Sequence, residues 1–429
     1  MRRRTHPTRA TPAAAPLPDA DRYLAIRGVS LSLAAPLSAE DCAIQSMPDA
    51  SPVKWHLAHT TWFFETFVLV PHAPRYRVFD PAYAFLFNSY YNSLGERHPR
   101  PERGMLSRPS LAAVLAYRRH VDDVMLAGLG ERAWRSRVAA LVALGLQHEQ
   151  QHQELILTDL KHLFSRNPLA PAYQKKWPLT PIRAREAHWI GFAGGLREIG
   201  HAGAGFRFDN ETPRHRVWML PFEIASHPVT HGEFIRFIED RGYQRPELWL
   251  SAGWDAVRAR GWQAPQYWTK GDQGWRTFTL HGEAPVDPNT PICHVSFFEA
   301  EAFARWAGAR LPSEAEWETA ATGLEAEGNF MESGALHPLA AREAPADGCL
   351  AQAYGDVWEW TRSDYGPYPG FRVPDGAVGE YNGKFMSGQY VLRGGSCATP
   401  RSHIRLSYRN FFPPDARWQF SGLRLARDA

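Results

Sequence analysis

The sequence predicts an α+β protein of two domains, a four-helix bundle followed by an irregular mixed domain. The chain has 429 residues, 44% of them hydrophobic, which is enough for two buried cores. Long stretches with helical spacing of apolar residues fill residues 19–166, among them 55–70, 111–129 and 133–164. Beyond them the chain changes to short β-like pieces rich in Gly, Pro and Trp, which is typical of a loop-rich α+β domain.

The elements follow in order along the chain. Residues 1–18 are rich in Arg, Pro and Ala and predict a disordered tail, with an organelle transit peptide as the alternative. The bundle is expected over 19–166, with Pro-rich breaks between its helices, and a Pro-rich linker over 167–187. The second domain is expected over 188–429, with its clearest helices at 296–309 and 313–323.

The charge balance and the cysteines exclude several classes of function. Lys and Arg number 48 against 45 Asp and Glu, so nucleic acid and anionic membranes are not expected as partners. The four cysteines are far apart and form no CxxC, which indicates neither a disulfide framework nor a zinc knuckle and favours the cytoplasm. No apolar stretch approaches the roughly 18 residues that a membrane span needs.

The chemistry of the chain is clearest in the pentad His148–His152, which reads HEQQH within a predicted helix. Two histidines four residues apart share one helix face, with about 6 Å of rise between them, and suit one metal ion. The pentad also matches HExxH, the zinc-protease pattern, in which Glu149 would be the general base. Such a protease needs a third ligand, and the following residues lack the usual HxxGxxH extension. An ordinary surface pair of histidines is a third interpretation.

Several phrases in the second half are distinctive when taken together. They are FDNETPRHRV (208–217), PFEIASHPVTHGEF (221–234), RLPSEAEWETAA (310–321), GDVWEWT (355–361), VLRGGSC (391–397) and FSGLRLA (420–426). This half closely resembles the formylglycine-generating-enzyme-like domain, a variant of the C-type lectin fold. That scaffold hosts enzymes, binding modules and structural appendages, so the resemblance implies the fold and assigns no thiol or copper role to the cysteines.

The first half supplies a second resemblance through WHLAHTTWFFE (55–65) and HEQQHQE (148–154). These phrases resemble the DinB-like bundle of the ergothioneine-forming sulfoxide synthases, in which the lectin-like domain follows the bundle. The resemblance implies a mononuclear non-haem Fe(II) enzyme that uses dioxygen to couple cysteine to the imidazole of hercynine. It implies His59, His148 and His152 as the metal ligands. His56 is a rival ligand that we expect to lie behind the metal ligands.

Two neighbours of the pentad need their own expectations. His162, further along the same predicted helix, is expected to be structural or at the surface. Glu149 is expected to face solvent or to lie behind the ligands if the protease interpretation is wrong.

The resemblance also implies roles for residues around the metal. The predicted loop 85–109 contributes a tandem pair of tyrosines, of which one or both would be the catalytic hydrogen donor, and two arginines that bind the carboxylate of the thiol substrate. The bundle adds an amide that reaches the substrate imidazole, and residues 407–422 close over the betaine group of hercynine. The residues implied are Tyr90 and Tyr91, Arg100 and Arg103, Gln151, and Asn410, Phe411 and Phe412.

The thiol substrate and the rival functions complete the expectations. Some relatives have Trp and Asp where this chain has Phe411 and Phe412, and the missing Asp favours cysteine over γ-glutamylcysteine. An ovothiol-type or selenoneine-type synthase is the close alternative, and a zinc protease or a binding protein the distant one. No loop with EF-hand spacing occurs, and the sequence does not decide whether a second, structural metal is bound. The sequence does not set the oligomeric state.

Overall fold

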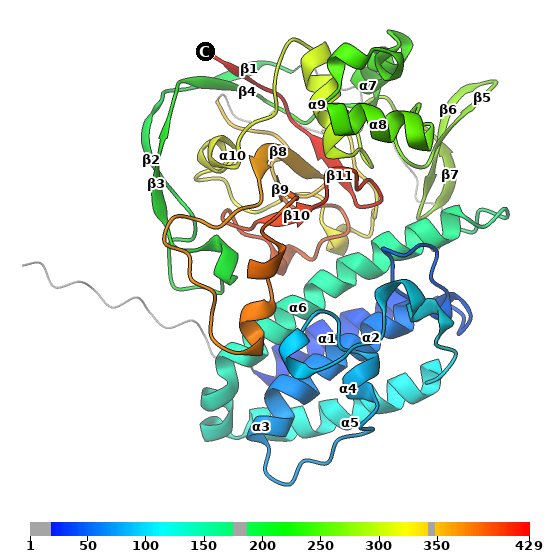
Figure 1. Ribbon diagram of the computed structural model, residues 1–429, viewed down its shortest axis with the longest axis vertical. Helices are drawn as coiled ribbons and strands as arrows, with labels where there is room; N and C mark the ends of the chain where they lie inside the picture. The colour runs from blue at the N-terminus through cyan, green and yellow to red at the C-terminus, as the bar shows by residue number, and fades with distance from the viewer. Residues whose placement is uncertain (1–18, 175–186, 342–347) are drawn as a thin grey trace, which may run out of the picture.

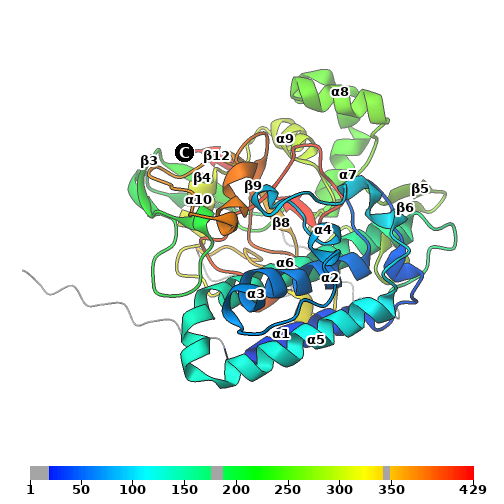
Figure 2. The ribbon, with the colours of Figure 1, turned by 60° about the horizontal axis from the view of Figure 1, so that its bottom comes forward.

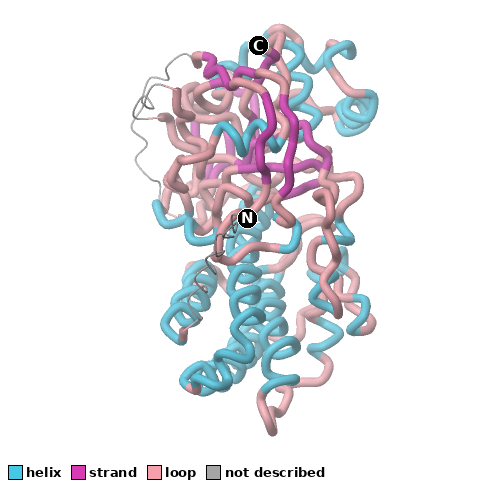
Figure 3. Tube along the Cα trace, turned by 90° about the vertical axis from the view of Figure 1, so that its left-hand side faces the viewer, coloured by secondary structure: helices cyan, strands magenta, loops and turns pink. Residues whose placement is uncertain are grey.

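The computed structural model describes residues 19–174, 187–341 and 348–429 and contains two domains, as the sequence predicts (Figure 1). The predicted tail, 1–18, and most of the predicted linker lie outside the described residues. One half of the molecule is built from helices and loops, and the other half contains the strands together with further helices (Figure 3). The predicted α+β class is confirmed.

The first domain is a helical bundle. Its helices are α1 (Ala20–Ala34), α2 (Val53–Phe64), α3 (Val70–His72), α4 (Tyr83–Leu86), α5 (Leu111–Gly130) and α6 (Arg132–Ser165). A π-helical segment, Glu65–Leu69, joins α2 to α3. The helices α1 and α5 lie on the side of the bundle away from the second domain, and α2 and α6 lie next to that domain (Figure 2).

A glycine allows α2 and α6 to approach closely. A side-chain carbon added to Gly145 of α6 would lie 2.6 Å from the ring of Phe64 on α2, well inside van der Waals contact. The two helices are long enough to place buried rows of side chains against each other, with Phe63 and Val142 fully buried in the bundle core. This close contact lies one turn before His148, and it brings the histidines of α6 near those of α2.

The second domain is built from short strands and helices. The strands are β1 (Trp189–Phe192), β2 (Gly195–Ile199), β3 (His215–Met219), β4 (Phe222–Ala225), β5 (Trp268–Gly271), β6 (Gly274–Thr279), β7 (Gly282–Pro285), β8 (Trp358–Asp364), β9 (Tyr390–Arg393), β10 (Asn410–Phe412), β11 (Ser421–Leu423) and β12 (Ala426–Asp428). The helices are α7 (His231–Glu239), α8 (Ser251–Arg260), α9 (Phe297–Trp306) and α10 (Glu314–Ala320).

Two of these helices were predicted and two were missed. The segments 296–309 and 313–323 form α9 and α10. The helices α7 and α8 were not recognised, although Thr230 and Glu233 form a capping box at the start of α7. That box is a readable start signal that could have identified α7.

The central sheet of the second domain has the order β10-β9-β8-β11. The strand β11 runs parallel to β8, and the other neighbours are antiparallel. Trp317, Trp358 and Trp360 are among the largest fully buried side chains and fill the core around this sheet. Arg424 and Glu359 form a buried ion pair at 2.7 Å within the same core. The sheet thereby holds its edge strand, β10, in a fixed position.

Helix α6 joins the two domains. Glu154 of α6 accepts hydrogen bonds from Trp358 Nε1 at 2.8 Å and from the hydroxyls of Ser396 and Thr399, both at 2.6 Å. Gln150 Nε2 donates to the hydroxyl of Ser402 at 2.6 Å. One helix therefore packs in the bundle core and also carries the polar contacts to the second domain. Among the residues that the structure describes, no helix is both long and apolar enough to cross a membrane.

Candidate metal centre and active site

Three buried histidines meet where α2 and α6 pack together. His59 comes from α2, and His148 and His152 come from α6; one ring nitrogen from each lies within 4.8 Å of the others. The Nε2 atoms of His59 and His148 are 3.1 Å apart. Nitrogens bound to one metal ion at about 2.1 Å lie about 3 Å apart, so this set can hold a single ion. The structure thus brings together the three histidines that the family resemblance implies.

Hydrogen bonds on the far side of two rings set which nitrogen faces the centre. His59 Nδ1 donates to the carbonyl oxygen of Phe87 at 2.6 Å, which leaves Nε2 as the free donor of electrons. His56 Nε2 lies 3.0 Å from a carboxylate oxygen of Asp159, which can only accept, and His56 Nδ1 lies 2.8 Å from His152 Nδ1. His56 therefore supports His152 from behind, as metal-binding histidines usually require.

Burial keeps the three rings neutral. It lowers the pKa of His148 to about 3 and, together with the neighbouring histidines, holds the pKa values of His59 and His152 well below the usual range. A metal ion binds the neutral imidazole, so the site is in its binding form at neutral pH.

Glu149 does not face this centre, which overturns the protease interpretation. Its carboxylate is fully buried and accepts from Arg27 at 2.8 Å, from Ser30 at 2.6 Å and from Arg118. A carboxylate held by two arginines inside the bundle cannot act as the general base of a protease. Of the two positions expected for Glu149, facing solvent or behind the ligands, the first is wrong, because its partners come from α1 and α5 and bury it.

A cavity of about 800 Å³ opens beside the histidines, between the two domains. His148 and His152 line its floor, the segment 89–103 lines one side, and the second domain supplies the roof. The roof residues are Trp358, Tyr381, Phe385, Tyr408, Asn410, Phe411, Phe412 and Trp418. The predicted loop 85–109 contains two 3-10 turns, Asn92–Leu94 and Arg100–Met105. The volume is typical of a small-molecule site.

The predicted tyrosine pair lies at the side of this cavity. The rings of Tyr90 and Tyr91 stack with centroids 4.7 Å apart. Tyr90 lines the cavity, and Tyr91 is fully buried behind it, 5.6 Å from the ring of Trp62. Burial raises the pKa of both phenols, so both keep their protons at neutral pH.

The two predicted arginines differ in their surroundings. Arg103 is only 3% exposed; its guanidinium lies 3.4 Å from the ring centre of Trp55 and donates to Ser51 Oγ at 2.9 Å. Among the described residues, no carboxylate lies within ion-pair distance of Arg103, and burial lowers its pKa to about 8. Arg100 is exposed, and its guanidinium donates to the carbonyl oxygen of Asp49. A buried cation that has no ion pair, and only the more distant carboxylate of Asp159 to offset its charge, is suited to bind an anionic ligand.

The amide of Gln151 is held by two tyrosines that the sequence analysis missed. Tyr381 donates its hydroxyl hydrogen to Gln151 Oε1, and Gln151 Nε2 donates to the hydroxyl oxygen of Tyr408 at 2.9 Å. Tyr381 also lies beside the metal-binding set, with its ring centroid 5.7 Å from that of His148. Tyr408 comes two residues before Asn410, inside a phrase that was recognised. Nothing in the local sequence around Tyr381 indicates that it reaches α6.

The predicted betaine-binding residues form the edge strand β10. Asn410, Phe411 and Phe412 are half-buried and line the cavity. The ring of Phe411 stacks on Tyr365 with centroids 4.0 Å apart, which fixes its aromatic face.

His162 does not belong to the set formed by His59, His148 and His152. Its ring contacts the Ser46 hydroxyl at 2.7 Å, in agreement with a structural role.

Comparisons with known proteins agree with this architecture. Residues 22–156 match the DinB superfamily, and residues 178–348 and 341–429 match the sulfatase-modifying factor enzyme 1-like domain. The chain is 36% identical over 411 residues to the hercynine oxygenase of Mycobacterium tuberculosis, covering 91% of this chain and 94% of the relative.

Two further relatives extend the comparison. The hercynine oxygenase of Mycolicibacterium thermoresistibile is 35% identical over 406 residues, covering 89% of this chain and 88% of that protein. Ergothioneine biosynthesis protein 1 of Schizosaccharomyces pombe is 27% identical over 236 residues, covering 52% of this chain and 28% of that protein. The domain order, the histidine set and the similarity over almost the full length together show that the chain belongs to the hercynine oxygenase family.

Proposed function

We propose that the protein is a mononuclear non-haem iron(II) sulfoxide synthase that couples cysteine to hercynine in ergothioneine biosynthesis. The observation that carries the proposal is the set of three neutral histidine nitrogens beside a cavity between the domains, two of which, from His148 and His152, line that cavity, in a member of the hercynine oxygenase family. Its four cysteines are free thiols in the described residues, which favours a reducing cytoplasm as the compartment.

The donor set fits iron(II). Three neutral imidazoles leave coordination positions open, and imidazole binds iron as well as zinc or copper. When bound, iron(II) would supply a site for the cysteine thiolate and would relay electrons from the two substrates to dioxygen. The overall reaction balances as cysteine plus hercynine plus dioxygen giving hercynylcysteine sulfoxide and one water. Two of the four electrons come from forming the carbon–sulfur bond and two from oxidising sulfur.

Arg103 is suited to bind the cysteine carboxylate. Its buried guanidinium can form two parallel hydrogen bonds to a carboxylate, and the substrate would provide the missing counter-charge. Arg100 lies at the more exposed part of the cavity wall and would add a weaker attraction. Together they would orient the sulfur of free cysteine towards the histidine set.

Gln151 and Tyr381 are suited to hold the imidazole ring of hercynine, and β10 to hold its betaine. The amide oxygen of Gln151 can accept a ring N–H without adding charge to the site. The aromatic faces of Phe411 and Phe412 suit a trimethylammonium group, which donates no conventional hydrogen bond. The Tyr90 hydroxyl, still protonated at neutral pH, can deliver its proton to the oxygen that is being reduced.

The proposal is tested by loading the protein with iron(II) without air and then adding hercynine, cysteine and dioxygen. We expect a sulfoxide product by mass spectrometry and dioxygen uptake that requires both substrates. Histidine in place of hercynine, and γ-glutamylcysteine or a selenosugar in place of cysteine, separate the related synthases. Dioxygen uptake with histidine but not with hercynine would overturn the proposed substrate.

Metal analysis tests the ligand set independently of activity. We expect His59→Ala to lose bound iron, because one of three protein ligands is removed. His162→Ala is the matched control, since it removes a histidine from α6 outside the set and should keep the metal. Equal metal content in the two variants would contradict the ligand assignment.

A further inference from the structure

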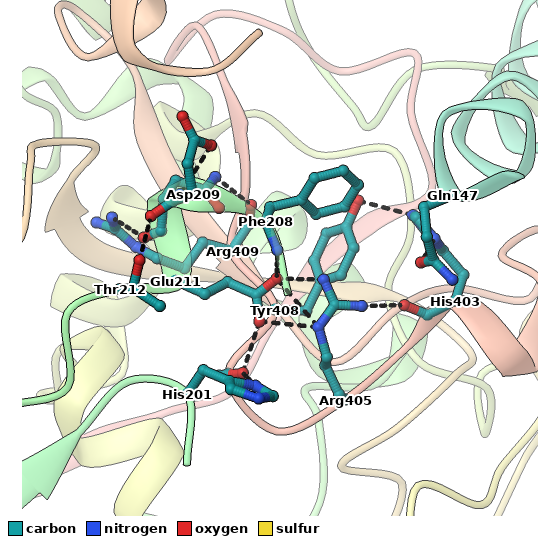
Figure 4. Close-up of polar contacts among 12 residues, drawn as sticks. Gln147, His201, Phe208, Asp209, Glu211, Thr212, His403, Arg405, Tyr408 and Arg409 are labelled. Carbon is teal, nitrogen blue, oxygen red and sulfur yellow. Dashed lines mark hydrogen bonds and ion pairs between the residues drawn. The ribbon is translucent and has the colours of Figure 1, made fainter. Parts of the chain in front are cut away.

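A chain of hydrogen bonds connects the second domain to Gln151. His403 lies at the end of a 3-10 turn, with Nδ1 2.7 Å from Gln147 Oε1 and Nε2 2.8 Å from the hydroxyl of Tyr408. That hydroxyl oxygen accepts from Gln151 Nε2 at 2.9 Å. Figure 4 shows His403 between Gln147 and Tyr408. Since Gln147 and Gln151 lie on α6 at either side of His148, the chain starts and ends next to a proposed metal ligand.

The hydrogen bonds of this series all run in one direction, because each group can only donate or only accept at its contact. Burial, with a smaller effect of Arg405, holds the pKa of His403 well below its usual range, so the ring is neutral and has one donor and one acceptor. Its Nδ1 faces an amide oxygen, which only accepts, so Nδ1 donates and Nε2 accepts from the Tyr408 hydroxyl. With its hydrogen committed, Tyr408 can only accept from Gln151.

The direction determines what Gln151 presents to the cavity. Because its Nε2 is bound to Tyr408, the oxygen Oε1 points towards Tyr381, whose hydroxyl donates to it. A carbonyl oxygen has two lone pairs, so Oε1 can accept one more hydrogen bond. Reversal of the chain would instead turn the NH₂ group to that side.

The two members of the hydrogen-bond series that lie in the second domain, His403 and Tyr408, are held in place by their surroundings. Arg405 pairs with the carboxylate of Glu211, and its guanidinium lies 5.0 Å from the ring centre of Tyr408 (Figure 4). Glu211 also accepts from the hydroxyl of Ser407 at 2.6 Å. Because Tyr408 and His403 are both buried, water does not compete for their hydrogen bonds.

We infer that His403 is a positioning residue for the imidazole substrate: through Tyr408 it holds the Gln151 amide with its oxygen free to accept the ring N–H of hercynine. The inference rests on the function proposed above and extends it to a residue that does not line the cavity. Loss of the His403 acceptor releases the Tyr408 hydroxyl hydrogen, and Gln151 can then adopt either orientation.

The test compares His403→Phe with the conservative His403→Gln. The side-chain amide oxygen of glutamine can reach the position of Nε2 and accept the hydrogen bond from Tyr408. Tyr408→Phe, which removes a single oxygen, serves as a second way to break the chain. Ser402→Ala is the matched control, because it removes another hydrogen bond between α6 and the second domain, the one from Gln150. Steady-state kinetics give separate KM values for hercynine and cysteine, and anaerobic calorimetry gives hercynine affinity directly.

We expect His403→Phe and Tyr408→Phe to raise the KM and the dissociation constant for hercynine about tenfold, with the cysteine KM changing less than about twofold. His403→Gln should recover most of the affinity, and Ser402→Ala should behave as wild type. Unchanged hercynine affinity in Tyr408→Phe, or equal losses for both substrates, would overturn the inference. Failure of the proposed function would look different, because the wild-type protein would then form no sulfoxide.

Discussion

Replacement of Arg103 by methionine should weaken the binding of cysteine without weakening the fold. The guanidinium is buried and has no carboxylate partner among the described residues, so the bound substrate would provide its counter-charge. Removing one partner of a buried, hydrogen-bonded charge pair costs roughly 2–5 kcal/mol. At about 1.4 kcal/mol per factor of ten, we expect the KM for cysteine to rise about 100-fold.

Arg103→Met should not destabilise the fold, although it weakens the binding of cysteine. The variant loses the contact of Arg103 with Trp55, about 2 kcal/mol for a desolvated cation over a ring, and its bond to Ser51. The variant also no longer buries a charge that lacks an ion pair, and this removes a destabilising contribution of several kcal/mol. Methionine keeps the apolar part of the arginine side chain in place. We therefore expect the free energy of unfolding to stay the same or to rise.

The assay is a cysteine titration at saturating hercynine, combined with urea unfolding of the same preparation. Arg100→Met is the control, because its guanidinium is exposed and should contribute less than about 1 kcal/mol. If Arg103→Met leaves the cysteine KM at the level of Arg100→Met, Arg103 does not bind the carboxylate. If it instead unfolds the protein, its charge is compensated within the fold and the reasoning fails.

Three further predictions concern the tyrosines, the helix contact and a buried lysine. Tyr90→Phe should lower the ratio of sulfoxide to oxidised cysteine more than Tyr91→Phe, because only Tyr90 lines the cavity; chromatography of both products checks this, and equal ratios would contradict it. Gly145→Ala should destabilise the fold by about 1–3 kcal/mol and lower metal affinity, since the added carbon would lie 2.6 Å from Phe64; unfolding and metal titrations measure both. Burial lowers the pKa of Lys161 to about 8, so the unfolded chain binds more protons than the folded one above that pH. The free energy of unfolding should therefore gain roughly 3 kcal/mol between about pH 8 and 10.5 in the wild type relative to Lys161→Met, and parallel pH profiles of the two proteins would refute this.

Helical periodicity predicted the parts of the site that lie on one helix. The segment 133–164 forms α6 with bounds one residue wider at each end, and the four-residue spacing places His148 and His152 on one face. The third histidine depends on how α2 packs on α6, which no local pattern encodes, and it came from the resemblance to a family. The same holds for Arg103, whose burial under Trp55 follows from tertiary packing.

The residues that were misread or missed depend on partners far away in the chain. Glu149 looks like a catalytic carboxylate in the pentad, but Arg27 and Arg118 from two other helices hold it inside the bundle. Tyr381 reaches Gln151 across 230 positions of sequence, so only the folded chain shows the contact. Short helices such as α7 were missed because nine residues give too little periodicity without attention to the caps.

The 34 residues of α6 carry two proposed ligands on one stretch and the contacts to the second domain on the same turns. The bundle expressed without its partner would leave the Glu154 carboxylate without the indole and the two hydroxyls that bind it. The two halves are thus not interchangeable modules, and grafting this bundle onto another lectin-like scaffold would require transplanting the matching docking residues as well. The helix α6 belongs to the bundle core and also forms the interface to the second domain, so a protein engineer cannot cut between the two domains without changing both.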